Sequence, residues 1–396
     1  MKKICVISSG RWDYGHLYWI MKGIEESNKL KLIIFSPGNH HCIKEMLKEF
    51  ETVSMLPEFN DIEDYGYFCK HVLHALKVYI PDIVIVLGDR YEIHAAATAA
   101  TLLNIPIAHI HGGETTTGAF DDYLRNSITM LATWHFTAHW RYVRKVCEMR
   151  GLDSYYCFKE LPNSNDDEWK DDGLPCDYSK KVYVVGAPGL DWLKCAKLYS
   201  KQELQRRIGI NLNEPYILAC FQPVTRELDN TARDMGEFLL ALAKTKEQTI
   251  LIRPNCDPGN NLINDLIDKS LAFSTYSHVT AVDNLDHLTY LSLMQFAGMM
   301  VGNSSSGIIE AASLNLPVVN VGSRQNGRIR NSNVFDCGYS AGDILRAMDR
   351  AMKWNALAGK CDNVYGDGHA SKRIVKILEA SKDIKMQNFC LKQEAL

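Results

Sequence analysis

Short apolar runs alternate with longer stretches of helical periodicity along the chain. Many of these runs are rich in β-branched residues, which is typical of buried strands. Their alternation with helices is the signature of βαβ units, so we expect an α/β fold whose parallel sheets carry helices on both faces. The runs span residues 3–8, 31–35, 82–88, 106–110, 181–186, 216–221, 249–253, 279–282, 299–302 and 317–322.

The two halves of the chain follow the same order of elements. Residues 84–113 and 298–324 each run from a strand through a glycine-containing polar turn and a helix to an Asn-x-Pro tripeptide and a second strand. This repeat predicts two similar doubly wound, Rossmann-like domains. Ligands of such sheets bind beyond the carboxyl ends of the strands, so we expect an interdomain cleft to hold the ligand.

Glycine and proline interrupt the pattern within residues 184–193 and indicate the domain boundary there. We therefore expect a first domain over residues 1–187 and a second over 188–368. An acidic, turn-rich segment inside residues 153–181 predicts a solvated surface insertion, with a lid or a subunit contact as the alternative. Residues 369–396 predict a helix and a frayed tail, and this helix could pack on the first domain.

Composition and charge narrow the possible partners. The chain has 396 residues, a formal net charge of -3 and a sequence pI of about 6.5, so it lacks the basic excess that binds nucleic acid or an anionic membrane. The first apolar run stops at Ser8, far short of a signal peptide, and no other run approaches a membrane span. We expect a cytoplasmic protein. The 12 cysteines form no C-x-x-C pair, which favours reduced core thiols over a metal or disulfide framework.

The second half contains a serine-rich turn between a strand and a helix. Backbone N–H groups at a helix start, together with serine hydroxyls, suit a phosphate, although a plain helix cap is the alternative. Glu310 follows about one turn later, where it could accept hydrogen bonds from a ribose diol. The turn comprises Ser304, Ser305, Ser306 and Gly307.

Arginines follow the next strand of the second half. Arg324, Arg328 and Arg330 come just after the run that ends at residue 322, and an arginine fork suits phosphate oxygens. We expect one of them to contact a diphosphate. Arg11, after the first strand, could approach the same ligand, although Arg11, Asp13 and Tyr14 could equally form a turn network.

Titratable residues gather after two strands of the first half. Asp89 ends one strand, where it could be catalytic or only a helix cap. The stretch "HIHGGETTTGAFDD", residues 109–122, follows the other. His109 lies in the apolar run and is expected to be a buried structural histidine. The remaining acids and base are expected to face a ligand and to supply a general base and acid: His111, Glu114, Asp121 and Asp122.

In these motifs the chain resembles the UDP-N-acetylglucosamine 2-epimerases, particularly the hydrolysing branch of sialic acid synthesis. The likeness covers roughly residues 1–375 and rests on "RWDYG", "GDRYE", "HIHGGETTTGAFDDYLR", "GAPGLD", "QPVT", "RPNCDPG", "GNSSSGIIE" and "GSRQNGR" in family order. It implies two Rossmann-like domains, as in the GT-B glycosyltransferases, with UDP bound by the second domain and the sugar lined by Asp89, the "HIHGGE" segment and Asp121. The implied UDP contacts are Arg11, Arg90, Gln222, Asn255, Val282 at the uracil, Ser304, Ser305, Ser306, Gly307, Glu310 and Arg324.

The resemblance implies a reaction that needs neither a nicotinamide nor a metal. UDP-N-acetylglucosamine would lose UDP by anti elimination, and water would add to the resulting 2-acetamidoglucal to yield N-acetylmannosamine. Many relatives carry Glu in place of His111, and the family usually has His in place of Gln222 and of Asn126. Arg125, which precedes Asn126, belongs to the expected catalytic set. The C2 base therefore stays open among His111, Asp89, Glu114, Asp121 and Asp122.

Three alternatives to this leading hypothesis remain. The substrate could be the UDP- or GDP-linked diacetamido-6-deoxy sugar of legionaminic-type pathways. The protein could be a GT-B glycosyltransferase that needs an acceptor, or a nucleotide-sugar binding protein without catalysis. The resemblance also implies a homodimer or homotetramer.

Overall fold

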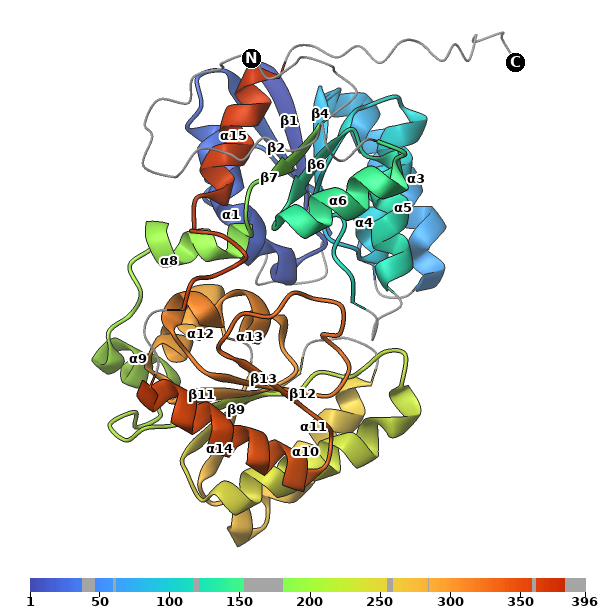
Figure 1. The fold of residues 1–396 in the computed structure, drawn as a ribbon. Helices are drawn as coiled ribbons and strands as arrows, with labels where there is room; N and C mark the ends of the chain where they lie inside the picture. The colour runs from blue at the N-terminus through green and yellow to red at the C-terminus, as the bar shows by residue number, and fades with distance from the viewer. Residues whose placement is uncertain are drawn as a thin grey trace, which may run out of the picture. The chain divides into compact units, whose positions relative to one another are not determined.

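The computed structural model describes residues 1–37, 47–59, 62–116, 121–152, 181–254, 259–283, 285–357 and 361–381, without the side chains of residues 11, 12 and 355–357. The chain divides into two compact units. The first comprises Met1–Gly113, Tyr123–Gly189 and His369–Leu396, and the second comprises Glu114–Asp122 and Leu190–Gly368 (Figure 1).

Within the described residues, the first unit is built on a parallel sheet of seven strands in the order β3-β2-β1-β4-β5-β6-β7. Its strands are β1 (Lys2–Ile7), β2 (Leu30–Pro37), β3 (Val53–Leu56), β4 (Ile83–Leu87), β5 (Ile107–Ile110), β6 (Trp134–Thr137) and β7 (Val182–Val184). Its helices are α1 (Arg11–Glu25), α3 (Tyr65–Tyr79), α4 (Tyr91–Leu102), α5 (Asp121–Leu131), α6 (Trp140–Met149) and α15 (Ala370–Ala380), with a 3-10 turn at Ile62–Asp64.

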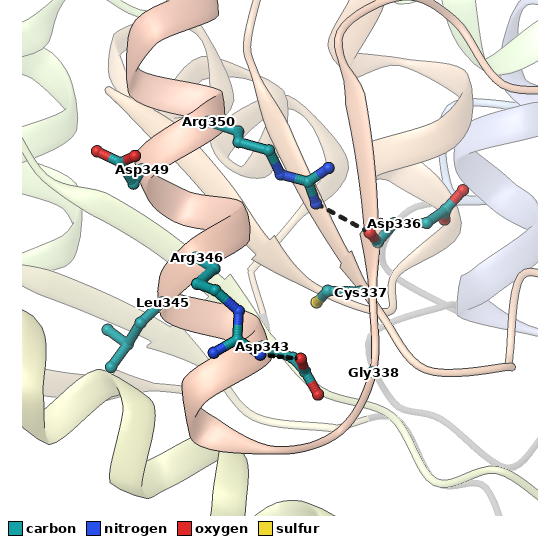
Figure 2. Close-up of a pocket in the computed structure, with 8 residues that line it drawn as sticks. All are labelled: Asp336, Cys337, Gly338, Asp343, Leu345, Arg346, Asp349 and Arg350. Atoms are coloured by element: carbon teal, nitrogen blue, oxygen red, sulfur yellow. Dashed lines mark hydrogen bonds and ion pairs between the residues drawn. The ribbon is translucent and has the colours of Figure 1, made fainter.

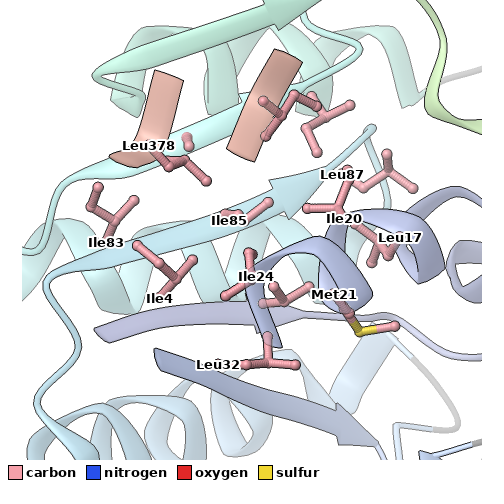
Figure 3. Packing of buried hydrophobic residues seen from close by; sticks show 14 of the residues in the cluster. Ile4, Leu17, Ile20, Met21, Ile24, Leu32, Ile83, Ile85, Leu87 and Leu378 are labelled. Atoms are coloured by element: carbon pink, nitrogen blue, oxygen red, sulfur yellow. The ribbon is translucent and has the colours of Figure 1, made fainter. Parts of the chain in front are cut away.

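The continuous apolar character of β1 follows from burial on both faces of this sheet. Successive strand side chains point to opposite faces. Ile4 and Val6 pack with α1 and α15, whereas Cys5 and Ile7 pack with α3, α4 and α5. Figure 3 shows the first of these layers, where the labelled side chains of β1, β2 and β4 meet α1 and Leu378 of α15. Helix α15, from the carboxyl-terminal end of the chain, thus completes the core of the first unit.

The described part of the second unit is built on a six-stranded parallel sheet in the order β10-β9-β8-β11-β12-β13. Its strands are β8 (Ile217–Cys220), β9 (Thr249–Ile252), β10 (Val279–Val282), β11 (Met299–Gly302), β12 (Val318–Val321) and β13 (Val334–Cys337). Its helices are α8 (Trp192–Cys195), α9 (Lys201–Ile208), α10 (Thr231–Thr245), α11 (Asn260–Leu271), α12 (His287–Phe296), α13 (Ser305–Ile309) and α14 (Ala341–Leu357). Its 3-10 turns are Leu228–Asn230, Ser274–Tyr276 and Ala311–Leu314, and a further one, Pro188–Asp191, spans the junction of the units.

Each sheet has a switch point where the strand order reverses. It lies between β1 and β4 in the first unit and between β8 and β11 in the second, which has the order 3-2-1-4-5-6 of a Rossmann sheet. The connections that follow the two strands at this point run to opposite sides. Their loops therefore diverge and leave room for a ligand at the carboxyl ends of the strands.

The expectation of an α/β fold with two Rossmann-like sheets is confirmed, and every expected strand forms. The repeated Asn-x-Pro tripeptides have a common conformation, because Asn104 and Asn315 both adopt left-handed φ angles of 59° and 51°. The apolar pattern did not predict β3, β6 and β13. β6 carries buried His135 and Thr137, whose polar side chains interrupt the apolar signal.

One segment groups differently from the expected boundaries. The expected first domain includes Glu114–Asp122, yet this segment clusters with the second unit. Within that unit Glu114 forms an ion pair with Arg328, and Thr115 packs against Gly327. Residues 153–180 of the expected insertion lie outside the described residues.

Candidate functional site

At the switch point of the second unit, a hydrogen-bonded pair of residues links the ends of two neighbouring strands. Asn303, which is fully buried after β11, accepts a hydrogen bond from the backbone N–H of Gln222 at 2.6 Å and donates to its carbonyl at 2.8 Å. Only glycine fits at position 302, where φ is 141° and a Cβ would overlap the carbonyl oxygen of Cys220. The ends of β8 and β11 are therefore held together just before the serine-rich turn begins.

The serine-rich turn begins α13. The side chain of Ser304 caps this helix by accepting a hydrogen bond from the N–H of Ser306 at 3.3 Å. Ser304, Ser305 and Ser306 are half-buried, and a Cβ on Gly307 would lie 2.8 Å from a methyl group of Val318. Serine hydroxyls and backbone N–H groups here could serve an anion.

Arg324 and Glu310 lie close to this turn. The Arg324 guanidinium donates to the Asn303 carbonyl at 3.2 Å, and Glu310 is only 2% exposed at the end of α13. Burial raises the pKa of the Cys220 thiol, while nearby Gln222 and Arg324 lower it. A cation, a carboxylate and several hydroxyls thus meet around one strand end, as a nucleoside diphosphate would require.

A series of side-chain contacts connects Asn303, which precedes this turn, with Glu114. Gln325 donates to the Asn303 carbonyl at 2.9 Å and accepts a hydrogen bond from Arg328 at 3.0 Å. Arg328 in turn lies 3.3 Å from the Glu114 carboxylate, which is only 1% exposed. The carboxylate of Glu114, a residue expected to face a ligand, thus lies against this half-buried guanidinium.

Two hydroxyls that the sequence did not single out belong to the same region. The oxygens Tyr290 Oη and Thr225 Oγ1 are buried and make no hydrogen bond of normal geometry within the described part of the chain. Thr225 lies three residues after Gln222, in the loop that follows β8. It belongs to the "QPVT" motif, which was the sequence signal available for it. Tyr290 lies within the apolar pattern of α12, so no sequence signal distinguished it from a core residue.

In the first unit, Asp89 and Arg125 form an ion pair beyond β4. Arg125 lies in α5 and is 3% exposed, whereas the Asp89 side chain is 21% exposed. Arg90, the next residue, contacts Glu92 through two hydrogen bonds of 3.3 and 3.2 Å. An expected UDP contact is therefore held by a local carboxylate.

Asp13 forms a turn network with Ser9, whereas Tyr14, named as a member of the alternative network, donates to Glu49 at 2.8 Å. The Asp13 carboxylate accepts hydrogen bonds from the N–H and the hydroxyl of Ser9 at 2.7 and 2.6 Å. Burial raises the pKa of Asp13 to about 6, partly offset by Ser9 and Arg90. This carboxyl group therefore titrates near neutral pH.

His109 and His111 lie in different environments. His109 is fully buried and contacts the Gly88 carbonyl at 2.7 Å and the Thr129 hydroxyl at 3.2 Å. His111 is half-buried at the end of β5 with a φ of 63°, an uncommon conformation for a residue with a side chain. Its ring meets the edge of the His16 ring at 6.0 Å between centroids.

The remaining expected residues are distributed as follows. Asp121 and Asp122 begin α5, and Asp122 accepts a hydrogen bond from the Thr116 N–H at 3.1 Å. Val282 is half-buried at the end of β10. The side chain of Arg11 and all of Asn255 lie outside the described residues.

A separate depression of about 710 Å³ lies between β13 and α14 (Figure 2). Its charged side chains have partners within the protein: Arg346 pairs with Asp343, Arg350 donates to the Asp336 carbonyl at 3.3 Å, and Asp349 pairs with Lys353. None of the residues that line this depression belongs to the serine-rich turn. Among the described residues, no three His, Cys, Asp or Glu side chains gather as a metal site would require.

The fold and these strand-end clusters define an α/β protein with polar residues at the switch points of two Rossmann-like sheets. The family model of UDP-N-acetylglucosamine 2-epimerase matches residues 22–379. The chain belongs to this family and is an enzyme of it, as the motifs predicted.

Individual relatives extend the match over nearly the whole chain. The hydrolysing UDP-N,N'-diacetylbacillosamine 2-epimerase of Legionella pneumophila is 30% identical over 96% of each chain. The hydrolysing GDP/UDP-N,N'-diacetylbacillosamine 2-epimerase of Campylobacter jejuni is 28% identical over 85% of this chain and 84% of that one. The crystal structure of UDP-GlcNAc 2-epimerase from Neisseria meningitidis bound to UDP-GlcNAc has a TM-score of 0.76 and 19% identity over 96% of this chain and 99% of that one, which establishes the fold alone.

No helix in the described ranges is both long and apolar enough to cross a membrane. The expectations of a cytoplasmic location and of a homodimer or homotetramer stay predictions.

Proposed function

We propose that the protein is a hydrolysing 2-epimerase whose substrate is a UDP-linked 2,4-diacetamido-6-deoxy sugar. The observation that carries this proposal is the 30% identity, over 96% of the chain, to a hydrolysing UDP-N,N'-diacetylbacillosamine 2-epimerase. The relative from Campylobacter jejuni bears a similar name. These relatives favour the diacetamido alternative over the leading expectation of UDP-N-acetylglucosamine, which becomes the second candidate.

The proposed reaction has two steps. In the first, the bond between C1 and the UDP oxygen breaks, a base takes the C2 proton, and a double bond forms between C1 and C2. In the second, water adds its hydroxyl to C1, and a proton adds to the opposite face of C2. The products are UDP and the free 2-epimeric sugar.

The second unit suits departure of UDP. The hydroxyls of Ser304 and Ser305 and the guanidinium of Arg324 surround one strand end, where they would stabilise the negative charge that develops on the leaving phosphate. Glu310, buried beside them, would accept hydrogen bonds from the ribose diol.

We assign the C2 base to His111. Its left-handed backbone is the kind of local strain that persists where the surrounding structure holds a residue for function. Glu114 is a weaker candidate because its carboxylate contacts Arg328. Asp89, whose charge Arg125 balances, would orient the sugar and stabilise the cation-like species formed at C1.

The decisive test is product analysis by NMR in deuterated water. The protein is incubated separately with UDP-N,N'-diacetylbacillosamine and with UDP-N-acetylglucosamine, without an acceptor. We expect a higher kcat/KM for the diacetamido substrate, release of UDP, and a free 2-epimeric sugar with deuterium at C2. A higher kcat/KM for UDP-N-acetylglucosamine would support the second candidate, and UDP binding without C2 exchange would indicate a silent binding protein.

A further inference from the structure

Tyr290 carries a buried hydroxyl that the fold itself does not use. The residue lies in α12, and its oxygen makes no hydrogen bond of normal geometry within the described ranges, although the hydroxyls of Ser306 and Ser304 lie near it. Leaving a buried hydroxyl without a partner is costly, and native structures contain few such groups. The position therefore needs an explanation beyond packing.

The start of α12 fixes where this phenol lies. Asp286 caps the helix by accepting hydrogen bonds from the N–H and the hydroxyl of Thr289 at 2.9 and 2.5 Å. The N–H of Tyr290 donates to the Asp286 carbonyl at 3.0 Å in the same turn. The cap therefore holds the first turn, and with it the tyrosine, in one position.

The surroundings of the phenol are those of the serine-rich turn. Burial is the main cause that raises the pKa of Tyr290, with smaller upward effects of Cys220 and Glu310. The hydroxyls of Ser306 and Ser304 are close enough to lower it, although neither completes a hydrogen bond of normal geometry with the phenol. Tyr290 consequently keeps its proton near neutral pH and remains a donor.

We propose that Tyr290 Oη donates a hydrogen bond to a phosphate oxygen of the nucleoside diphosphate bound at the serine-rich turn. The inference rests on the proposed function, because it adds a residue to the same UDP site. A bound phosphate would supply the acceptor that the protein leaves open. The site would then draw donors from α12 as well as from the loop after β11.

The test compares UDP with uridine, which lacks the phosphates. Tyr290→Phe keeps the ring and removes only the donor. Because a hydrogen bond to a charged group contributes substantially, we expect UDP affinity, measured by calorimetry, to fall by about 10-fold or more. Uridine affinity, measured by ligand-observed NMR titration, should stay within about twofold. The Tm of the ligand-free variant should not fall, since the lost hydroxyl makes no hydrogen bond of normal geometry there.

Tyr216→Phe is the matched control from the same unit. Tyr216 is 1% exposed and donates to the Leu293 carbonyl at 2.6 Å, so its hydroxyl is structural. This variant should lower the Tm and leave UDP affinity unchanged. Unchanged UDP affinity in Tyr290→Phe, or an equal loss for UDP and uridine, would overturn the inference. Absence of UDP binding by the wild-type protein would overturn the proposed function together with it.

Discussion

The ion pair of Glu114 and Arg328 yields a prediction about stability. The two charged groups lie 3.3 Å apart, and their side chains are only 1% and 13% exposed. At an effective dielectric constant of about 20, Coulomb's law gives an attraction of roughly 5 kcal/mol at this distance. Removing one partner of a buried pair typically costs about 3–5 kcal/mol, because the other charge stays desolvated. This is a large part of the 5–15 kcal/mol that stabilises a typical domain.

The perturbation is Arg328→Met, which keeps an unbranched side chain and removes the charge. We expect the free energy of unfolding, measured by urea denaturation, to fall by about 3 kcal/mol or more. Glu114→Gln in the same background should cost much less than it does in the wild-type protein. The double-mutant cycle should therefore yield a coupling energy of about 2 kcal/mol or more.

An exposed pair provides the control. Lys353 and Asp349 are 2.6 Å apart in α14, but their side chains are 70% and 57% exposed. Lys353→Met should change stability by less than about 0.5 kcal/mol, because water screens this pair. A loss below about 1 kcal/mol for Arg328→Met, with a coupling energy near zero, would refute the reasoning.

Three further predictions concern binding, pH and packing. Arg324→Ala should weaken UDP binding about 10-fold or more in calorimetry. Asp89→Asn should lower kcat about 100-fold or more and leave UDP affinity nearly intact. Equal losses of UDP affinity in both variants would contradict the separate roles of Arg324 in binding and Asp89 in catalysis. Burial lowers the pKa of His135 to about 3 in the folded protein, whereas the unfolded chain takes up this proton below about pH 6.5. The free energy of unfolding should therefore fall as the pH drops from 6.5 towards 3. The variant His135→Val should show a flatter pH dependence of stability in urea titrations. Gly302→Ala should prevent folding of the second unit or lower its Tm strongly. Gly236→Ala in α10 is the control: a Cβ added there meets no atom within 4 Å, so the Tm should stay unchanged or rise. If Gly302→Ala is tolerated, the strand end can shift to make room for a side chain.

The candidate site shows where prediction from sequence ends. Motifs that lie together along the chain were readable, since the serine-rich turn and the cluster after β5 carry their residue types within a few positions. Tyr290 could not be recognised, because its neighbours at the phenol come from the loop after β11, more than ten positions away. The position of Glu114 was also unpredictable. Its contact with Arg328 joins residues more than 200 positions apart.

The sequence by itself determined the α/β class, the repeat of two Rossmann-like halves and the positions of most strands, because burial on both faces imposes a local apolar pattern. The tertiary structure decided the order of the strands, and with it which strand ends meet at each switch point. It also decided that β6, despite two buried polar residues, is a strand, because its neighbours β5 and β7 supply its hydrogen bonds. Backbone pairing and charge burial depend on partners distant in the chain, so no local pattern records them.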